Sequence, residues 1–281
     1  MKKKPYRKEF YSGITVTILL LGLILWMGSL KKQQDVDILL FGDSVIGINH
    51  TSVKIPELLE QKLGKTVYNA AFGGSSLSAG TTKSASYTEE SISFVHLAEA
   101  LCAGDFSTQE SDLASSRDRV VNNENFLKIL RGLKTVDLSQ VSVIVIEHGV
   151  NDFNSERPLD NLENPYDICS FGGALRYSIE ILQKNYPNIQ IVLVSPAYFY
   201  LQKTDMDCYS IDYGYGTMEA YVDLEKEIAE VYGLPFIDML HSLPIHLENI
   251  YVYTEDGMHL TEEGFKLYGD YLAQQLKEEL Q

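Results

Sequence analysis

The chain has 281 residues, of which 45% are hydrophobic and 22% are charged, a composition typical of one globular domain with a short addition. Its charge is unevenly distributed. Residues 1–32 contain seven Lys or Arg and one Glu, which leaves 16 basic and 38 acidic residues in the remainder, a net charge of −22. So acidic a body excludes nucleic acid as a partner, because phosphate binding requires clustered Lys and Arg.

The first 30 residues have the pattern of a membrane anchor. Residues 1–10 are basic and predict a cytoplasmic tail, and residues 11–30 predict a transmembrane signal-anchor, since no charged residue occurs between Ser12 and Leu30. A cleaved signal peptide is the alternative, but its apolar region is normally shorter and ends at a small-residue site. The excess of Lys and Arg before the span predicts a cytoplasmic N-terminus and an extracytoplasmic body.

Strands and helices alternate along the rest of the chain. Apolar runs predict strands at 36–41, 65–69, 141–146, 189–194 and 235–238. Apolar residues at helical spacing predict helices at 55–63, 174–185, 218–232 and 261–280, the last capped by Thr261. This alternation predicts an α/β fold with a mainly parallel central sheet, whose ligands bind at the carboxyl ends of the strands.

Two segments interrupt the alternation. Residues 75–140 are too long for a single helix-bearing connection, and residues 198–217 are rich in Tyr and Asp. Both connect at the edge of the sheet where ligands bind, so we interpret them as loops that shape a substrate site. Ordinary surface insertions are an equally weighted alternative. The domain that carries them is predicted to extend over residues 33–281.

Four short segments, each beside a predicted strand end, carry the chemistry. They are Phe41-Gly42-Asp43-Ser44, Asn69-Ala70-Ala71-Phe72-Gly73-Gly74, Gly149-Val150-Asn151-Asp152 and Asp256-Gly257-Met258-His259. Ser44 is a candidate nucleophile and His259 its base, while Asp256 can orient His259 and stabilise its charged form. Each segment alone is as common as an ordinary turn, but the four in this order predict a serine hydrolase.

The same segments contain the donors that a developing oxyanion requires. We predict three donors: the Ser44 backbone amide, the amide of a glycine after the second strand, and the Asn151 side chain. A glycine is suitable because no side chain obstructs the approach to its amide. As an alternative, Asn151 and Asp152 could cap a helix.

The four segments resemble the sequence blocks of the SGNH (GDSL-like) hydrolase superfamily, and the resemblance covers nearly all of residues 36–280. It implies a three-layer, flavodoxin-like fold. It also implies that Ser44 is the nucleophile, that His259 is the base, and that Gly74 and Asn151 complete the oxyanion hole.

Details of the resemblance favour one glycine and leave one pair of residues without a role. Gly74 is chosen over Gly73, because the family's glycine usually falls five residues after the Asn of its block. Val45 replaces the leucine of the family's name, at a position without a catalytic atom. Glu147 and His148 match no family feature that we can assign, and a structural role for His148 is favoured over a substrate contact.

These features predict a membrane-anchored, outward-facing serine esterase. Its expected substrate is an O-acyl ester, foremost an O-acetyl ester, on a cell-envelope glycan or a small molecule. The alternatives are an O-acyltransferase that uses the same serine and a non-catalytic glycan-binding module. No metal or cofactor is predicted, since no Cys-x-x-Cys or His-x-x-x-His pair occurs. Cys102, Cys169 and Cys208 permit at most one intramolecular disulfide.

Overall fold

The computed structural model describes residues 34–47, 52–80, 91–115 and 123–280, and the elements below belong to the unit Asp35–Gln281. The central sheet contains, in spatial order, β2 (Val67–Asn69), β1 (Ile38–Gly42), β3 (Val143–Glu147), β4 (Gln190–Val194) and β7 (Phe236–Ile237). All pairings within this sheet are parallel. The predicted parallel α/β fold is therefore confirmed, with the strand order of a flavodoxin-like sheet.

Two of the three interior strands, β1 and β3, are covered on both faces, as parallel strands are when helices flank a sheet. β1 and β3 are continuous runs, and every residue in them is buried. Their register pairs Leu40 with Val145 and Gly42 with Glu147. The two strands therefore end side by side, and the segments that follow them start from the same edge of the sheet.

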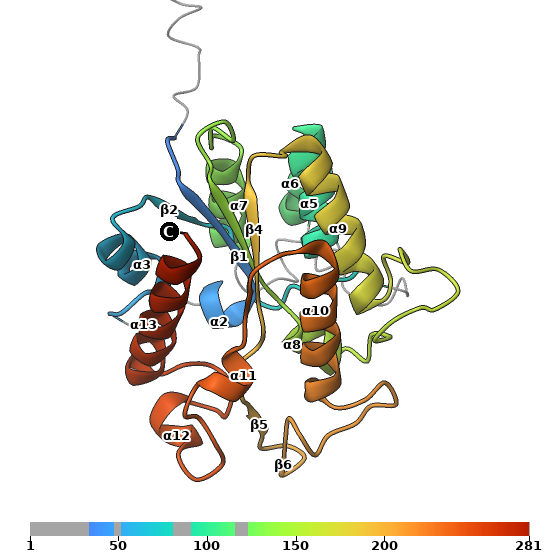
Figure 1. Cartoon of the computed structure of the whole chain (residues 1–281), viewed down its shortest axis with the longest axis vertical. Coiled ribbons are helices and arrows are strands. Elements are labelled where there is room, and N and C mark those ends of the chain that lie inside the picture. Colours follow the sequence, from blue (N-terminus) through green and yellow to red (C-terminus); the bar gives the residue numbers. More distant parts are fainter. Residues whose placement is uncertain (1–33, 48–51, 81–90, 116–122, 281) are drawn as a thin grey trace, which may run out of the picture. The chain divides into compact units, whose positions relative to one another are not determined.

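Helices lie on both sides of the sheet (Figure 1). In chain order they are α2 (Ser44–Gly47), α3 (Ile55–Leu63), α5 (Phe94–Ala103), α6 (Ser107–Ser115), α7 (Asn123–Leu133), α8 (Val150–Asn154), α9 (Phe171–Asn185), α10 (Met218–Tyr232), α11 (Met239–Ser242), α12 (Ile250–Tyr253) and α13 (Glu262–Glu279). α3 packs on α13 on one side, and α9 packs between α5 and α10 on the other. This arrangement is the predicted three-layer one.

Local sequence signals placed several helix boundaries correctly. The predicted helices 55–63 and 218–232 coincide with α3 and α10, and both end before a glycine. The Thr261 hydroxyl caps α13 as predicted, because it accepts a hydrogen bond from the Gly264 amide at 3.2 Å.

The interpretation of residues 75–140 as a loop is wrong for much of its described part. α5, α6 and α7 lie there, and α5 adds Phe94, Val95 and Leu101 to the buried core. Only His96 and Glu99 among the ten residues of α5 are polar, so the one-sided pattern by which an amphipathic helix is recognised is weak in the sequence. The segment 198–217 does remain largely a loop, with the short antiparallel strands β5 (Tyr200–Leu201) and β6 (Met206–Asp207).

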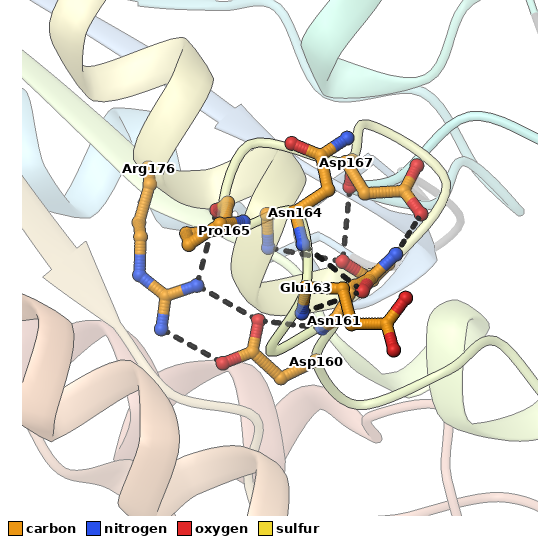
Figure 2. Close-up of polar contacts among 9 residues, drawn as sticks. Asp160, Asn161, Glu163, Asn164, Pro165, Asp167 and Arg176 are labelled. Atoms are coloured by element: carbon orange, nitrogen blue, oxygen red, sulfur yellow. Dashed lines mark hydrogen bonds and ion pairs between the residues drawn. The ribbon is translucent and has the colours of Figure 1, made fainter.

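A hydrogen-bonded loop joins α8 to α9 (Figure 2). Two guanidinium nitrogens of Arg176 donate to the two carboxylate oxygens of Asp160, at 2.8 and 2.9 Å. These bonds lower the pKa of Asp160. Within the loop, the Asn161 side-chain amide donates to Asp167 at 2.8 Å. The connection is thus fixed by its own side chains and by the charge of Arg176 in α9.

The remaining sequence predictions concern the cysteines and the N-terminal region. Cys102, Cys169 and Cys208 are free thiols, so the one disulfide that the sequence permits is not formed. The predicted tail and anchor, residues 1–10 and 11–30, lie outside the described residues. In the part of the chain that is described, no helix combines the length and the apolar character needed to cross a bilayer.

Candidate active site

Ser44 lies just beyond the end of β1. The strand stops at Gly42, and Ser44 is the first residue of the four-residue helix α2. The Asp43 carboxylate accepts a hydrogen bond from the Val45 amide at 2.9 Å, so the turn is held by its own side chain. Asp43 is fully buried, whereas Ser44 is only half-buried. The serine is therefore presented at the sheet edge while its neighbour is kept from water.

The predicted base and its carboxylate meet this serine. His259 Nε2 lies 3.2 Å from Ser44 Oγ, and His259 Nδ1 lies 2.7 Å from Asp256 Oδ2. The other oxygen of Asp256 accepts the His259 backbone amide at 2.8 Å. Because the carboxylate at Nδ1 assigns the ring proton to that nitrogen, Nε2 is left as the acceptor that a general base requires.

Asp256 carries the negative charge of this arrangement. Burial raises the pKa of Asp256, but hydrogen bonds from the His259 amide, the His259 ring and the Met258 amide outweigh burial and leave the pKa lowered. Its side chain is 52% exposed, so water screens part of its charge. Asp256 is ionised at neutral pH, and its main effect is to orient His259.

The same local geometry occurs a second time, without a serine. His241 Nδ1 lies 2.8 Å from Asp238 Oδ2, and the His241 backbone amide donates to Asp238 Oδ1 at 3.0 Å. His241 Nε2 faces Glu219 Oε1 at 3.7 Å. Asp-x-x-His is thus a local motif in this chain, and the contact with Ser44 is what distinguishes one copy as a catalytic candidate.

The β5–β6 hairpin holds the loop that carries Asp256 and His259. The Tyr200 amide donates to the Gly257 carbonyl at 2.8 Å. Gly257 has a φ of +92°, and a Cβ on it would overlap the Tyr200 carbonyl oxygen, so only glycine fits. The Tyr-rich segment 198–217 therefore touches the candidate site directly.

The glycine turn that follows β2 lies against the serine. The Ser75 amide donates to the Phe72 carbonyl at 3.0 Å, which closes a turn over Gly73 and Gly74. Gly74 has a φ of +81°, as the third residue of a type II turn requires. A Cβ on Gly73 would lie 3.7 Å from the Cβ of Ser44. Gly74, the predicted oxyanion donor, is thus the neighbour of Gly73, the residue that lies against Ser44.

Asn151 reaches the same place, but its side-chain amide is already engaged. The Asn151 Nδ2 donates to Asp43 Oδ2 at 2.9 Å and to the Ser75 carbonyl at 3.1 Å. Both hydrogens of that nitrogen therefore have acceptors in this structure. For Asn151 to donate to an oxyanion, the hydrogen now directed at Ser75 must be redirected or shared.

Asp152, the next residue, fixes the segment after the glycine turn. Its carboxylate accepts the Leu77 amide at 2.7 Å, the Ser78 amide at 2.9 Å and the Ser78 hydroxyl at 2.5 Å. Burial raises the pKa of Asp152 more than these bonds lower it. The alternative that Asn151 and Asp152 cap a helix is wrong, because Gly149 occupies the cap position of α8.

Glu147 and His148, which the sequence left without a role, are buried behind the site. His148 is 1% exposed, and its ring lies 5.6 Å from that of Phe94. Burial lowers the pKa of His148 to about 3, so the ring is uncharged at neutral pH. A buried and uncharged ring is out of a substrate's reach, which favours the structural role for His148.

Three contacts of the site have no sequence signal. Asp43 belongs to the Gly-Asp-Ser segment, but nothing in the sequence indicates that its carboxylate accepts a hydrogen bond from Asn151, 108 residues away. The carbonyl of Ser75 and the hairpin contact at Gly257 are backbone interactions, which leave no mark in side-chain patterns. Among the described residues, no group of three or more His, Cys, Asp or Glu is arranged to hold a metal ion.

A polar cavity of about 340 Å³ lies elsewhere, along α5 and α6. Its lining includes His96, Glu99, Gln109 and Asp112 but none of the three residues of the hydrogen-bonded chain from Asp256 to Ser44. We therefore take the exposed edge around Ser44, rather than this cavity, as the candidate active site.

Comparisons with known proteins agree with the fold described above. The model of the GDSL-like lipase/acylhydrolase family matches residues 40–267. One solved structure is 22% identical and covers 88% of this chain and 99% of its own, with a TM-score of 0.62. A possible lipase from Chitinophaga pinensis is 16% identical (86% and 98% covered, TM-score 0.54). Est24, a carbohydrate acetylesterase from Sinorhizobium meliloti, is 14% identical (86% and 99% covered, TM-score 0.51). No curated protein matched the sequence.

Proposed function

Because the chain belongs to the GDSL-like lipase/acylhydrolase family of ester-hydrolysing enzymes, we propose that Ser44, His259 and Asp256 are the catalytic triad of a serine esterase. The observation that carries this proposal is the 3.2 Å separation of His259 Nε2 and Ser44 Oγ. At that distance the histidine can accept the serine proton as the hydroxyl attacks.

The reaction follows from the order of these groups. Ser44 Oγ attacks the ester carbonyl carbon while His259 Nε2 takes the hydroxyl proton, and ionised Asp256 stabilises the resulting imidazolium. The bond to the alcohol oxygen then breaks, His259 returns the proton to that oxygen, and the acyl group stays on Ser44. Water activated by the same nitrogen attacks the acyl carbon, releases the acid and restores the serine.

We assign stabilisation of the oxyanion to the Ser44 amide, the Gly74 amide and the Asn151 side chain. The position of the glycine turn against Ser44 supports the second donor. The third requires Asn151 to keep its bond to Asp43 and to turn the hydrogen now on Ser75 toward the substrate. Each such donor typically stabilises the transition state by about 3 kcal/mol.

The substrate that we propose is an O-acyl ester, foremost an O-acetyl ester, on a cell-envelope glycan. Tyr209 and Tyr215 of the hairpin segment and Tyr251 of α12 are 38%, 43% and 54% exposed. Tyrosine offers an apolar ring face together with a hydroxyl, which suits the faces and hydroxyls of sugar rings. The shared fold with Est24, a carbohydrate acetylesterase, is compatible with this substrate class.

We also propose that residues 11–30 anchor the enzyme in the cytoplasmic membrane, with residues 1–10 inside and the domain 33–281 outside. The support is the uncharged run and the excess of Lys and Arg before it. An anchored enzyme is suited to a polymer that does not diffuse. Protease treatment of intact cells tests the orientation: the domain should be digested and the N-terminal tail protected, and the reverse pattern would contradict it.

Hydrolysis of 4-nitrophenyl acetate tests the triad. The wild-type chain should release nitrophenolate in water alone, and Ser44→Ala should lower kcat/KM by about 10³-fold or more. Ser142→Ala is the matched control, because Ser142 is exposed just before β3, at the opposite end of that strand from the site. Full activity of Ser44→Ala would refute the proposed mechanism.

Mass analysis of envelope glycans tests the substrate. A strain without the gene should accumulate acyl groups on one glycan, and wild-type enzyme but not Ser44→Ala should remove them. Loss of acyl groups in that strain would instead establish the acyltransferase, in which a sugar hydroxyl replaces water. Unchanged glycans would contradict both.

A further inference from the structure

A group of buried acids lies behind Ser44 and takes no part in the triad. Glu147 at the end of β3, Glu225 in α10 and Tyr268 in α13 are each no more than 1% exposed. Their side-chain oxygens have no hydrogen-bond partner among the residues that the structure describes. Since buried polar groups normally have partners, these three require an explanation.

Glu147 lies beside the turn that presents the nucleophile. Gly42 and Glu147 are paired across β1 and β3. Glu147 Oε2 lies so close to Gly42 that a Cβ added to Gly42 would be 3.0 Å from this oxygen. The backbone amide of Asp43, the next residue, favours a charged Glu147, but it does not reach hydrogen-bond geometry with either oxygen.

Asp43 has the partners that Glu147 lacks. One oxygen accepts the Val45 amide and the other accepts Asn151 Nδ2, each at 2.9 Å. Donors stabilise a carboxylate over its protonated form. Because two adjacent buried carboxyl groups strongly disfavour a second charge, the group with donors keeps the charge and the other keeps the proton.

The surroundings of Glu147 favour its neutral form. Burial raises the pKa of Glu147 well above its ordinary value, and the charges of Asp43 and of Glu225, from α10, raise it further. Tyr268, from α13, is a neutral phenol whose own pKa burial raises. Burial also raises the pKa of Asp43, to about 6. At neutral pH, Asp43 is therefore ionised and Glu147 is not.

We propose that Glu147 is a positioning residue: as a neutral acid beneath the nucleophile turn, it leaves the single negative charge of the buried pair on Asp43, where that charge orients the Asn151 side-chain amide. This inference rests on the proposed triad mechanism. A charged Glu147 would place a second negative charge near the developing oxyanion and oppose it. Activity should therefore fall at alkaline pH as Glu147 loses its proton.

The pH profile of ester hydrolysis tests this role. Glu147→Gln, a permanently neutral side chain of the same shape, should keep kcat at pH 7 within about 3-fold, and it should move the alkaline decline upward by about one pH unit or more. Glu225→Gln is the matched control, because it neutralises an equally buried acid that is not paired across the sheet with Gly42. That variant should not move the alkaline decline upward, because Glu225 acts only to raise the pKa of Glu147.

Asp43→Asn tests the connection to Asn151. Without the charge, Asn151 loses its ionic acceptor, so kcat should fall by about 10-fold or more while KM changes little. In this background the alkaline decline should begin at a lower pH, because the Asp43 charge no longer raises the pKa of Glu147. An alkaline decline that Asp43→Asn leaves unmoved would overturn the proposal.

Thermal unfolding gives a readout that does not depend on the substrate. Relative to wild type, Glu147→Gln should raise Tm by about 3 °C or more at pH 8 and by little at about pH 4, where the unfolded chain also holds most of the proton. Glu147→Met serves the same purpose if Gln folds poorly. A constant Tm difference across pH would show that Glu147 is not a neutral acid and would overturn the inference, even if no ester is turned over.

Discussion

Among single residues, the contact between His259 and Ser44 carries the most information about the mechanism. The Asp-x-x-His pattern occurs twice with nearly the same internal distances, at 256–259 and at 238–241. The two copies differ in what Nε2 faces: Ser44 Oγ in one and Glu219 in the other. A pair of substitutions can therefore separate the effect of the local motif from that of the contact.

Replacement of the two histidines should give opposite results. His259→Ala removes the base, so kcat/KM for 4-nitrophenyl acetate should fall by about 10³-fold or more. His241→Ala removes a ring with the same local partners and no serine, and it should leave kcat/KM within about 2-fold. Steady-state kinetics on both variants checks this, and equal losses would mean that the serine contact is not decisive.

The two aspartates extend the same comparison. Asp256→Asn should lower kcat by about 10²- to 10⁴-fold, because the amide no longer assigns the proton to His259 Nδ1. Since Asp256 is half exposed and screened by water, we expect the lower end of that range. Asp238→Asn should leave kcat nearly unchanged. A kcat for Asp256→Asn at the wild-type level would remove Asp256 from the triad.

At the scale of elements, the loop that carries the histidine depends on its neighbour, the β5–β6 hairpin. The Tyr200 amide and the Gly257 carbonyl are hydrogen-bonded, and the two backbones approach too closely for any Cβ at position 257. The Thr254 hydroxyl accepts the Gly257 amide at 3.1 Å from the other side. The catalytic geometry of Asp256 and His259 is thus shared between two segments that are far apart in sequence.

Gly257→Ala should disrupt this arrangement. The positive φ and the overlap with the Tyr200 carbonyl together should destabilise the fold by about 2 kcal/mol or more and lower kcat by displacing His259. Gly64→Ala is the matched control, because Gly64 has a φ of +65° but open space around a Cβ; it should cost about 1 kcal/mol and leave kcat intact. Urea unfolding and kinetics on both variants check this, and equal effects would contradict the contact.

The sequence predicted best those elements whose boundaries are set by nearby residues, such as a capping side chain, a terminal glycine or a continuous apolar run. Capping by Thr261 and terminal glycines placed α3, α10 and α13, and continuous apolar runs placed β1 and β3 within two residues. α5 was missed because eight of its ten residues are apolar, and only His96 and Glu99 mark its polar face. The triad residues were predicted from motif order, whereas the acceptors of Asn151 depend on tertiary contacts that no spacing encodes.

For the molecule as a whole, the balance of buried acids sets the pH dependence of stability. Glu147 and Glu225 have pKa values raised well above their ordinary value, mainly by burial. Such groups stabilise the fold fully only below the pKa of the unfolded chain, about 4.3, and the stability is lost as pH rises toward the folded pKa. Burial of neutral His148 has the opposite pH dependence. Its contribution to stability is fully present above about pH 6.5, the pKa of the unfolded chain, and is lost as pH falls.

The wild-type Tm should therefore fall between pH 7 and 8.5. In that window each buried glutamic acid that remains protonated lowers the free energy of unfolding by about 1.4 kcal/mol per pH unit. The expected decline is about 8 °C or more in Tm, measured by calorimetry at constant ionic strength. Glu225→Gln should reduce the slope. A Tm that rises over this window would contradict the protonation states assigned here.

The proposed mechanism requires an acyl group that resides on Ser44 during turnover. The most direct measurement is peptide mass analysis of the enzyme quenched with acid while it turns over 4-nitrophenyl acetate. We predict an acetyl group on the peptide that contains Ser44, and its absence in Ser44→Ala. Turnover without any modified peptide, or with the acetyl group on another residue, would contradict the mechanism.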